Sequence, residues 1–220
     1  MAQQRTSALV VTPNIQHVSL LENDDEFAAV YASTPYQYAD GWPVVRAARR
    51  MSGSPVERVT GYELLPAVLD RAAALGVPVA FAGGRPGTER LVGDAAQRRH
   101  PGLVVVHAEA ETYSVGDGSV PLLARRLTDS GASLTVLGLG PPKQELVGAA
   151  LVEAGVGVVL CIGSALEVLA GTNRRAPPSF QRLHMEWLYR VLREPRRLAG
   201  RYLTTYPHFL SICRRQRRAG

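Results

Sequence analysis

The sequence predicts an α/β fold: a layered, parallel, Rossmann-like sheet flanked by helices and followed by a C-terminal helical appendage. Two observations support this prediction. Short apolar, β-rich runs alternate with longer helical stretches along most of the 220 residues, which is the element order of a parallel sheet with helical crossovers. The runs are also apolar on both faces, as expected for strands that helices cover on both sides.

The predicted strands share a short apolar centre bounded by turn residues. They comprise residues 8–12, 36–39, 77–81, 103–106, 134–137 and 156–162. The longest apolar run is the last of these, and it is far shorter than the roughly 20 residues that a membrane-spanning helix needs. No signal peptide is expected, because the first apolar stretch covers only residues 8–11. We therefore expect a cytoplasmic protein.

The predicted helices lie between these strands, and capping residues and glycines mark their ends. Asn23 or Asp24 is a suitable N-cap for a helix over 24–32, and Gly76 ends a helix over 62–75. The remaining helices are one that begins at Pro43 and three that cover 87–99, 119–130 and 143–154.

The sequence changes character after Gly171. Residues 171–178 contain glycine, asparagine and two prolines and are predicted to form a linker. A helix is predicted over 180–193, and a second from 196 to about 205, because Pro207 should end it.

Positive charge is concentrated in this C-terminal part. Residues 174–220 contain twelve arginines and two acids, a net charge of +10, whereas residues 1–173 have a net charge of −4 and the whole chain +6. We therefore divide the chain into an α/β domain, 1–173, and an arginine-rich helical appendage, 174–220. An anionic membrane surface and a nucleic acid are the two polyanions that such an appendage suits. We expect no nucleic acid, because the tail lacks the interleaved aromatic residues of a stacking platform.

Two groups of apolar residues in the appendage have different expected roles. Trp187 belongs to a helical stripe that is expected to pack on the sheet domain. A second group lies among arginines and is expected to face the membrane. It consists of Leu203, Tyr206, Phe209, Leu210 and Ile212.

Glycines and polar residues gather where the predicted strands end, which in a parallel sheet is where ligands bind. Asp40 follows one strand and precedes Gly41, a placement that suits either a general base or a simple Asp-Gly turn. Gly83 and Gly84 precede a predicted helix, where backbone N–H groups can bind phosphate. The complete dinucleotide pattern G-x-G-x-x-G is absent there.

The run from Gly138 to Glu145 is the most distinctive of these strand exits. Its two glycines and two prolines form a rigid turn that places Lys143 and Gln144 at a helix N-terminus. The chain contains no Walker loop, no nucleophile elbow and no H-E-x-x-H motif, and its five histidines and two cysteines lack metal-ligand spacing. We therefore expect no metal and no cofactor, with arginines neutralising any diphosphate charge.

Six motifs follow one another along the chain. They are 12–14 (Thr-Pro-Asn), 39–41 (Ala-Asp-Gly), 57–61 (Glu-Arg-Val-Thr-Gly), 138–145, Ala170-Gly171 with 175–177, and 186–190 with 194–197 and 201–202. Their order and spacing resemble the WecG/TagA/CpsF family of bacterial glycosyltransferases over nearly the whole chain. The resemblance implies an inverting, metal-independent enzyme bound peripherally to the inner face of the cell membrane. It would move a sugar, N-acetylmannosamine-type or hexose, from a UDP-sugar to a polyprenyl-diphosphate-linked sugar in cell-surface polysaccharide or teichoic acid biosynthesis.

The resemblance also implies roles for individual residues. Asp40 matches the proposed general base. The positions that match the substrate-binding residues of the family are Thr12, Asn14, Arg58, Gln144, Arg190 and Arg197. Of these, Arg190 and Arg197 match arginines that are expected to face the UDP diphosphate. The nucleotide-binding positions are expected at Gly83, Gly84, Gly138, Gly140, Lys143 and Glu167.

This chain also departs from the family pattern. Family members usually begin with an additional strand and helix, so we expect the sheet edge to be open or covered by another subunit of a homo-oligomer. Residues 111–114 replace a Gly-Tyr-Phe motif, residues 163–165 replace a more glycine-rich exit, and Glu167 stands where an Asp is usual. Two alternatives stay open: a catalytically degenerate scaffold of a polysaccharide complex, and a basic-tailed nucleic-acid-binding α/β protein.

Overall fold

The computed structural model describes residues 7–219, without the side chains of Arg197 and residues 217–219, and contains a six-stranded sheet. The strand order is β2-β1-β6-β5-β3-β4, and every neighbouring pair is parallel. The strands are β1 (Ala8–Val11), β2 (Tyr36–Gln37), β3 (Val79–Gly83), β4 (Val105–Glu109), β5 (Leu134–Gly138) and β6 (Val158–Cys161). The predicted α/β class and parallel sheet are confirmed.

The helices begin and end largely at the predicted signals. The side chain of Asp24 accepts a hydrogen bond from the backbone of Phe27 and caps the first long helix, and Gly76 ends another with a left-handed φ of 63°. The helices of the α/β body are α1 (Ile15–Leu20), α2 (Asp25–Ser33), α3 (Trp42–Ser52), α4 (Gly61–Leu75), α5 (Glu89–Arg99), α6 (Ser119–Asp129), α7 (Lys143–Glu153) and α8 (Ala165–Leu169). The appendage contains α9 (Pro178–Arg182), α10 (Glu186–Arg193) and α11 (Pro195–Ala219).

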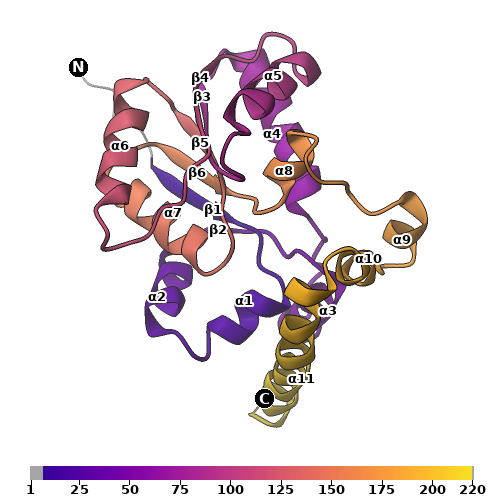
Figure 1. Ribbon diagram of the computed structural model, residues 1–220. Coiled ribbons are helices and arrows are strands. Elements are labelled where there is room, and N and C mark those ends of the chain that lie inside the picture. The colour runs from indigo at the N-terminus through magenta and orange to yellow at the C-terminus, as the bar shows by residue number, and fades with distance from the viewer. Residues whose placement is uncertain (1–6, 220) are drawn as a thin grey trace.

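Two apolar clusters pack on opposite faces of the sheet, and alternate strand residues belong to each. Along β3, Val79 and Phe81 join one cluster and Ala80 and Ala82 the other, and all four are at most 1% exposed. The cluster of Ala80 includes residues of α2, α6 and α7, and the cluster of Phe81 includes residues of α4, α5 and α8. Figure 1 shows these two sets of helices on either side of the sheet.

The long helix α11 packs on the α/β body through a third apolar cluster. Ile15 of α1, Val44 of α3 and Phe209 of α11 form its buried centre, and Tyr202 packs against them. Figure 1 shows α11 beside α1 and α3. Within residues 7–219, no helix combines the length and the apolar character that crossing a bilayer requires.

The expectation that Pro207 ends a helix is wrong, because α11 runs through it. A proline removes one backbone donor from a helix, and the burial of Phe209 and Ile212 on the body beyond it offsets that loss. The same burial corrects the expectation that these two side chains face a membrane. The other members of that group are exposed: Leu203, Tyr206 and Leu210.

The predicted helix over 180–193 is instead divided into α9 and α10. His184 lies between them with a φ of 60°, a left-handed conformation that interrupts a helix. Trp187 is 48% exposed and its ring lies 5.8 Å from that of Tyr202. It therefore packs on α11 rather than on the sheet domain, contrary to the prediction. The short helices α1 and α8 were not predicted.

Gly138 is the glycine whose replacement should test the packing of the sheet against α8. A Cβ atom at this position would lie 2.5 Å from Cδ2 and 2.8 Å from Cβ of the buried Leu166, whereas a Cβ at Gly140 would meet nothing within 4 Å. We expect Gly138→Ala to lower the free energy of unfolding by about 1–3 kcal/mol, because the core must shift to accommodate it. Gly140→Ala is the matched control. Equal stability of the two variants in denaturant titrations would contradict this packing.

Candidate active site

A cavity of about 1150 Å³ opens at the carboxyl edge of the sheet. Residues that directly follow β1, β5 and β6 line one side of it, among them Thr12, Leu139 and Ile162. Residues of α10 and α11 line another side. The cavity therefore lies between the α/β body and the arginine-rich appendage.

Most of the predicted site residues line this cavity together. They are Thr12, Asn14, Asp40, Arg58, Gly84, Gly138, Gly140, Lys143, Gln144, Glu167 and Arg190. Gly83 does not line it. Arg197 belongs to α11, and its side chain lies outside the part of the chain that the structure describes.

Asp40 is held at the cavity by backbone hydrogen bonds that continue the pairing of β1 with β2. The Tyr38 N–H donates to the Val11 carbonyl at 2.9 Å, and the Asp40 N–H donates to the Pro13 carbonyl at 2.8 Å. On the other side, the Val59 N–H donates to the carbonyl of Ala39 at 3.1 Å. The loops that contain Asp40, residues 12–14 and Arg58 are thereby fixed relative to one another.

The carboxyl group of Asp40 is largely enclosed by protein, although part of the residue faces the cavity. This burial raises its pKa from 3.8 to about 6. The charge of Glu186 raises the pKa further, whereas Arg58, Arg190 and His17 lower it. A carboxylate with a pKa near 6 is ionised at neutral pH and is a stronger base than an exposed one.

The other two acids that line the cavity have partners. Glu186 lies 3.5 Å from Arg58, and Glu167 contacts Arg85 at 3.3 Å and Asn173 at 3.1 Å. Within residues 7–219, the Asp40 carboxylate alone among the three has no hydrogen-bond or ion-pair partner. It is therefore the acid that is available to accept a proton from a ligand.

A chain of alternating charges joins the appendage to the body beside the cavity. Arg175 lies 3.2 Å from Glu63, which lies 3.5 Å from Arg58, and Arg58 in turn contacts Glu186 of α10. Arg58 also lies 5.7 Å from the centre of the Trp42 ring. The segment between Arg175 and Glu186 is thus attached to the body at both ends.

The glycines after β3 serve the packing of the strands. A Cβ at Gly83 would lie 2.9 Å from the carbonyl oxygen of Gly138, so β3 and β5 approach closely there. The Gly84 N–H donates to the same oxygen at 2.7 Å. Because this donor is already used, a phosphate at this loop would need other N–H groups, and the predicted nucleotide role of Gly83 and Gly84 stays a prediction.

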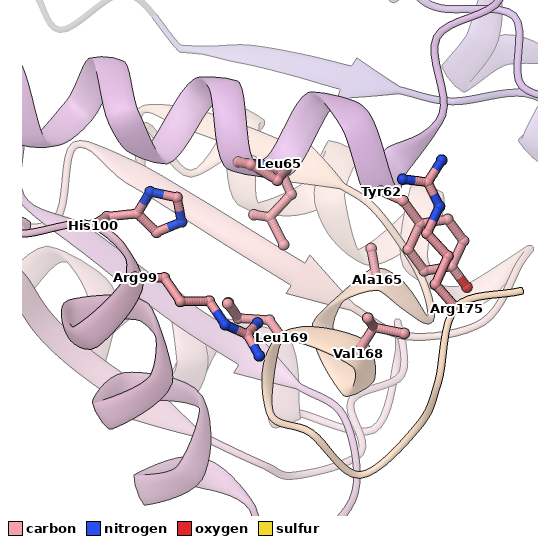
Figure 2. A pocket seen from close by; sticks show the side chains of 9 residues that line it. Tyr62, Leu65, Arg99, His100, Ala165, Val168, Leu169 and Arg175 are labelled. Atoms are coloured by element: carbon pink, nitrogen blue, oxygen red, sulfur yellow. The ribbon is translucent and has the colours of Figure 1, made fainter. Parts of the chain in front are cut away.

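A second cavity, of about 170 Å³, lies beside α4 and α8 (Figure 2). It is lined by Tyr62, Leu65, Pro66, Arg99, His100, Ala165, Val168, Leu169 and Arg175. Arg175 lies over the ring of Tyr62 at 5.4 Å, and the Tyr62 hydroxyl is 2.8 Å from Ser164 Oγ. None of the predicted site residues lines this cavity, and we place the candidate site in the larger one.

Several residues of the larger cavity were missed by the sequence analysis as site residues. They are His17, Trp42, Arg46, Glu186 and Arg201. Glu186 is one helical turn before Arg190, which places the two on one face of α10. His17 lies three residues after the N-cap Asn14, in the capping-box position of α1. Both spacings were visible in the sequence, whereas the closure of the cavity by α10 and α11 was not.

Replacing Asp40 tests the origin of its raised pKa. Because the folded state raises this pKa from 3.8 to about 6, ionised Asp40 destabilises the fold above pH 6. The penalty declines as the pH falls below 6 and disappears below about pH 3, where folded and unfolded chains are both protonated. We expect Asp40→Asn to raise the free energy of unfolding at pH 8 by about 1–3 kcal/mol, with the gain declining from pH 6 to pH 4.

Chemical denaturation across this pH range measures the effect, with Asp94→Asn as the same change at an exposed position of α5. A pH-independent effect of Asp40→Asn would show that the carboxyl group is not desolvated.

The chain was compared with models of known protein families. The model described as the glycosyl transferase WecG/TagA/CpsF family matches residues 1–220. This family comprises UDP-sugar-dependent glycosyltransferases that make cell-surface polysaccharides, and it implies a sugar donor and a lipid-linked acceptor.

Proposed function

Because the chain belongs to the WecG/TagA/CpsF family of glycosyltransferases, we propose that it transfers a sugar from a UDP-sugar to a polyprenyl-diphosphate-linked sugar. Transfer proceeds with inversion and without a metal, and Asp40 is the general base. The donor sugar is of the N-acetylmannosamine type or a hexose. Residues 1–173 form the catalytic domain, and residues 174–220 form an appendage that binds the inner face of the membrane.

The proposal rests on the position of Asp40 at the cavity and on the raised pKa of its carboxyl group. Asp40 lines a cavity large enough for a nucleotide sugar and an acceptor sugar. Its carboxylate lacks a partner within the described residues and has a pKa of about 6. His17 also lines the cavity, but both of its ring nitrogens have partners inside the protein. Asp40 is therefore the best placed proton acceptor of the site.

The proposed reaction is a single displacement at the anomeric carbon of the donor. The acceptor hydroxyl oxygen forms the new bond while the bond from the anomeric carbon to the UDP oxygen breaks, which inverts the configuration. The hydroxyl proton moves to Asp40, and the bonding electrons leave with UDP.

The negative charge that develops on the leaving diphosphate needs compensation. Five cationic side chains line the cavity: Arg46, Arg58, Lys143, Arg190 and Arg201. Lys143 is the first residue of α7, where the helix dipole also favours an anion. Positive groups fixed in this way stabilise charge as it forms, and they support the proposal that no metal is required.

Exposed apolar residues stand at the side of the cavity formed by the appendage. Leu183, Leu203 and Tyr206 line the cavity and are 68%, 76% and 45% exposed. Side chains of this kind, among arginines, suit the interface of an anionic bilayer. A lipid-linked acceptor anchored in that bilayer would reach Asp40 from this side.

The role of Asp40 predicts a pH profile. Because the base must be ionised, we expect kcat/KM to rise with pH up to a plateau above an apparent pKa of about 6. Asp40→Asn should lower kcat by about 10²–10⁴-fold at pH 8. Mass-detected transfer from a panel of UDP-sugars to a synthetic polyprenyl-diphosphate sugar measures both, and unchanged turnover in Asp40→Asn would refute the role.

Glu186 provides an internal check on this assignment. Its charge raises the pKa of Asp40, so Glu186→Gln should move the acid limb of the profile to lower pH. A limb that stays in place in Glu186→Gln would mean that another group titrates.

Membrane recruitment should depend on the exposed apolar residues of α11. We expect Leu203→Ser combined with Leu210→Ser to lower flotation with anionic vesicles several-fold, because buried apolar area drives interfacial binding. Leu122→Ser, at a 57% exposed position of α6, is the control on the body. Equal recruitment of the two variants, or stronger binding to RNA than to vesicles, would oppose the membrane assignment.

A further inference from the structure

Glu145 is a charged side chain buried beneath the cavity that the proposed reaction does not use directly. It lies in the first turn of α7, is 0% exposed and does not line the cavity. One of its oxygens, Oε1, is bonded to two residues that do line the cavity. His17 Nε2 lies 3.1 Å from this oxygen, and Gln144 Nε2 donates to it at 2.8 Å.

The hydrogen bonds of His17 define its tautomer. The Asn14 backbone N–H donates to His17 Nδ1 at 3.2 Å, so Nδ1 must present a lone pair. The other ring nitrogen, Nε2, is then protonated and donates to Glu145. The ring is fixed at both nitrogens, and with it the N-terminal turn of α1 that includes Asn14.

The amide of Gln144 is fixed in the same way. Its nitrogen donates to Glu145, and its oxygen accepts the Gly163 N–H at 2.8 Å. An exchange of the amide oxygen and nitrogen would place two donors against each other at Gly163 and two acceptors against each other at Glu145. The amide therefore has one orientation, and it connects the exit of β5 with that of β6.

This arrangement is unfavourable for stability. The second oxygen of Glu145, Oε2, and the hydroxyl of the buried Tyr31 have no hydrogen-bond partner within the described residues. A buried carboxylate oxygen and a buried hydroxyl without hydrogen-bond partners have lost their hydration without replacement, which costs stability. Groups that a fold retains against its own stability are concentrated at functional sites.

We propose that Glu145 is a positioning residue for the glycosyl transfer, whose buried carboxylate fixes the His17 ring and the Gln144 amide so that three strand-exit loops present their groups to the cavity in one arrangement. The loops are those after β1, β5 and β6, and they supply Asn14, Gln144 and Gly163. The inference rests on the proposed function for its effect on turnover, and on the hydrogen bonds alone for its effect on geometry.

Two substitutions separate the functions of the Glu145 carboxylate. Glu145→Met fills the same space without an acceptor, and we expect kcat to fall about 10–100-fold, as misplacement of reacting groups does. Glu145→Gln retains an oxygen at the Oε1 position and should restore kcat to within about fivefold of the wild type. Glu145→Met leaves the buried donors of His17 and Gln144 without an acceptor and should also lower the melting temperature, whereas Glu145→Gln keeps an acceptor and should leave the melting temperature close to that of the wild type.

A direct readout of geometry does not depend on activity. The Gly163 amide proton is held by the Gln144 oxygen, so its hydrogen exchange, followed by NMR, should accelerate in Glu145→Met and remain slow in Glu145→Gln. Glu153→Met removes a carboxylate from the exposed end of the same helix and is the control for both measurements.

The outcomes decide between the alternatives. Wild-type kcat in Glu145→Met, or an unchanged Gly163 exchange rate, would overturn the proposal. A loss of activity that parallels a loss of melting temperature, without rescue by Glu145→Gln, would also overturn it and assign Glu145 to stability. If the wild type transfers no sugar from any UDP donor, the proposed function fails, and the exchange of Gly163 still decides whether Glu145 positions Gln144.

Discussion

The backbone hydrogen bond from Asp40 to the Pro13 carbonyl is the interaction on which the geometry of the site depends. It extends the pairing of β1 and β2 beyond the last paired residues, from the interior of the protein into the wall of the cavity. The strand β2 is only two residues long and exposed, so this extension, and not the strand itself, gives the acid a fixed place. A side chain on a free loop could reach the same position only at a cost in conformational entropy.

The pKa of Asp40 reflects two opposing effects of that place. Burial and Glu186 raise it, and the positive charges of Arg58 and Arg190 lower it, which leaves it at about 6. Burial raises the pKa and the arginines lower it, so the two effects partly cancel. Two of the groups that act on this pKa, Glu186 and Arg190, belong to α10. Residues of the appendage therefore help to set the pKa of the proposed base. They do so only while the appendage covers the cavity.

The sequence was sufficient to predict the elements whose signals are local. Apolar runs that alternate with helical stretches predicted the parallel sheet, and Asp24 and Gly76 marked helix ends. The polar residues at the strand exits converge on one cavity, because parallel strands end at the same edge of the sheet. Features that depend on distant contacts were not predictable. The continuation of α11 through Pro207 depends on the burial of Phe209, and the contact between His17 and Glu145 joins residues that are 128 apart in the chain.

The faces of α11 relate the proposed membrane binding to the proposed chemistry. Residues 205, 209 and 212 are buried along one face of the helix, whereas residues 203, 206 and 210 are exposed on a neighbouring face. Because the first face is fixed to α1 and α3, the second has a defined direction relative to the cavity that it helps to line. A bilayer bound to the exposed face would hold the entrance of the cavity against the membrane surface. The appendage would then align a lipid-linked acceptor with Asp40 without any movement of the α/β body.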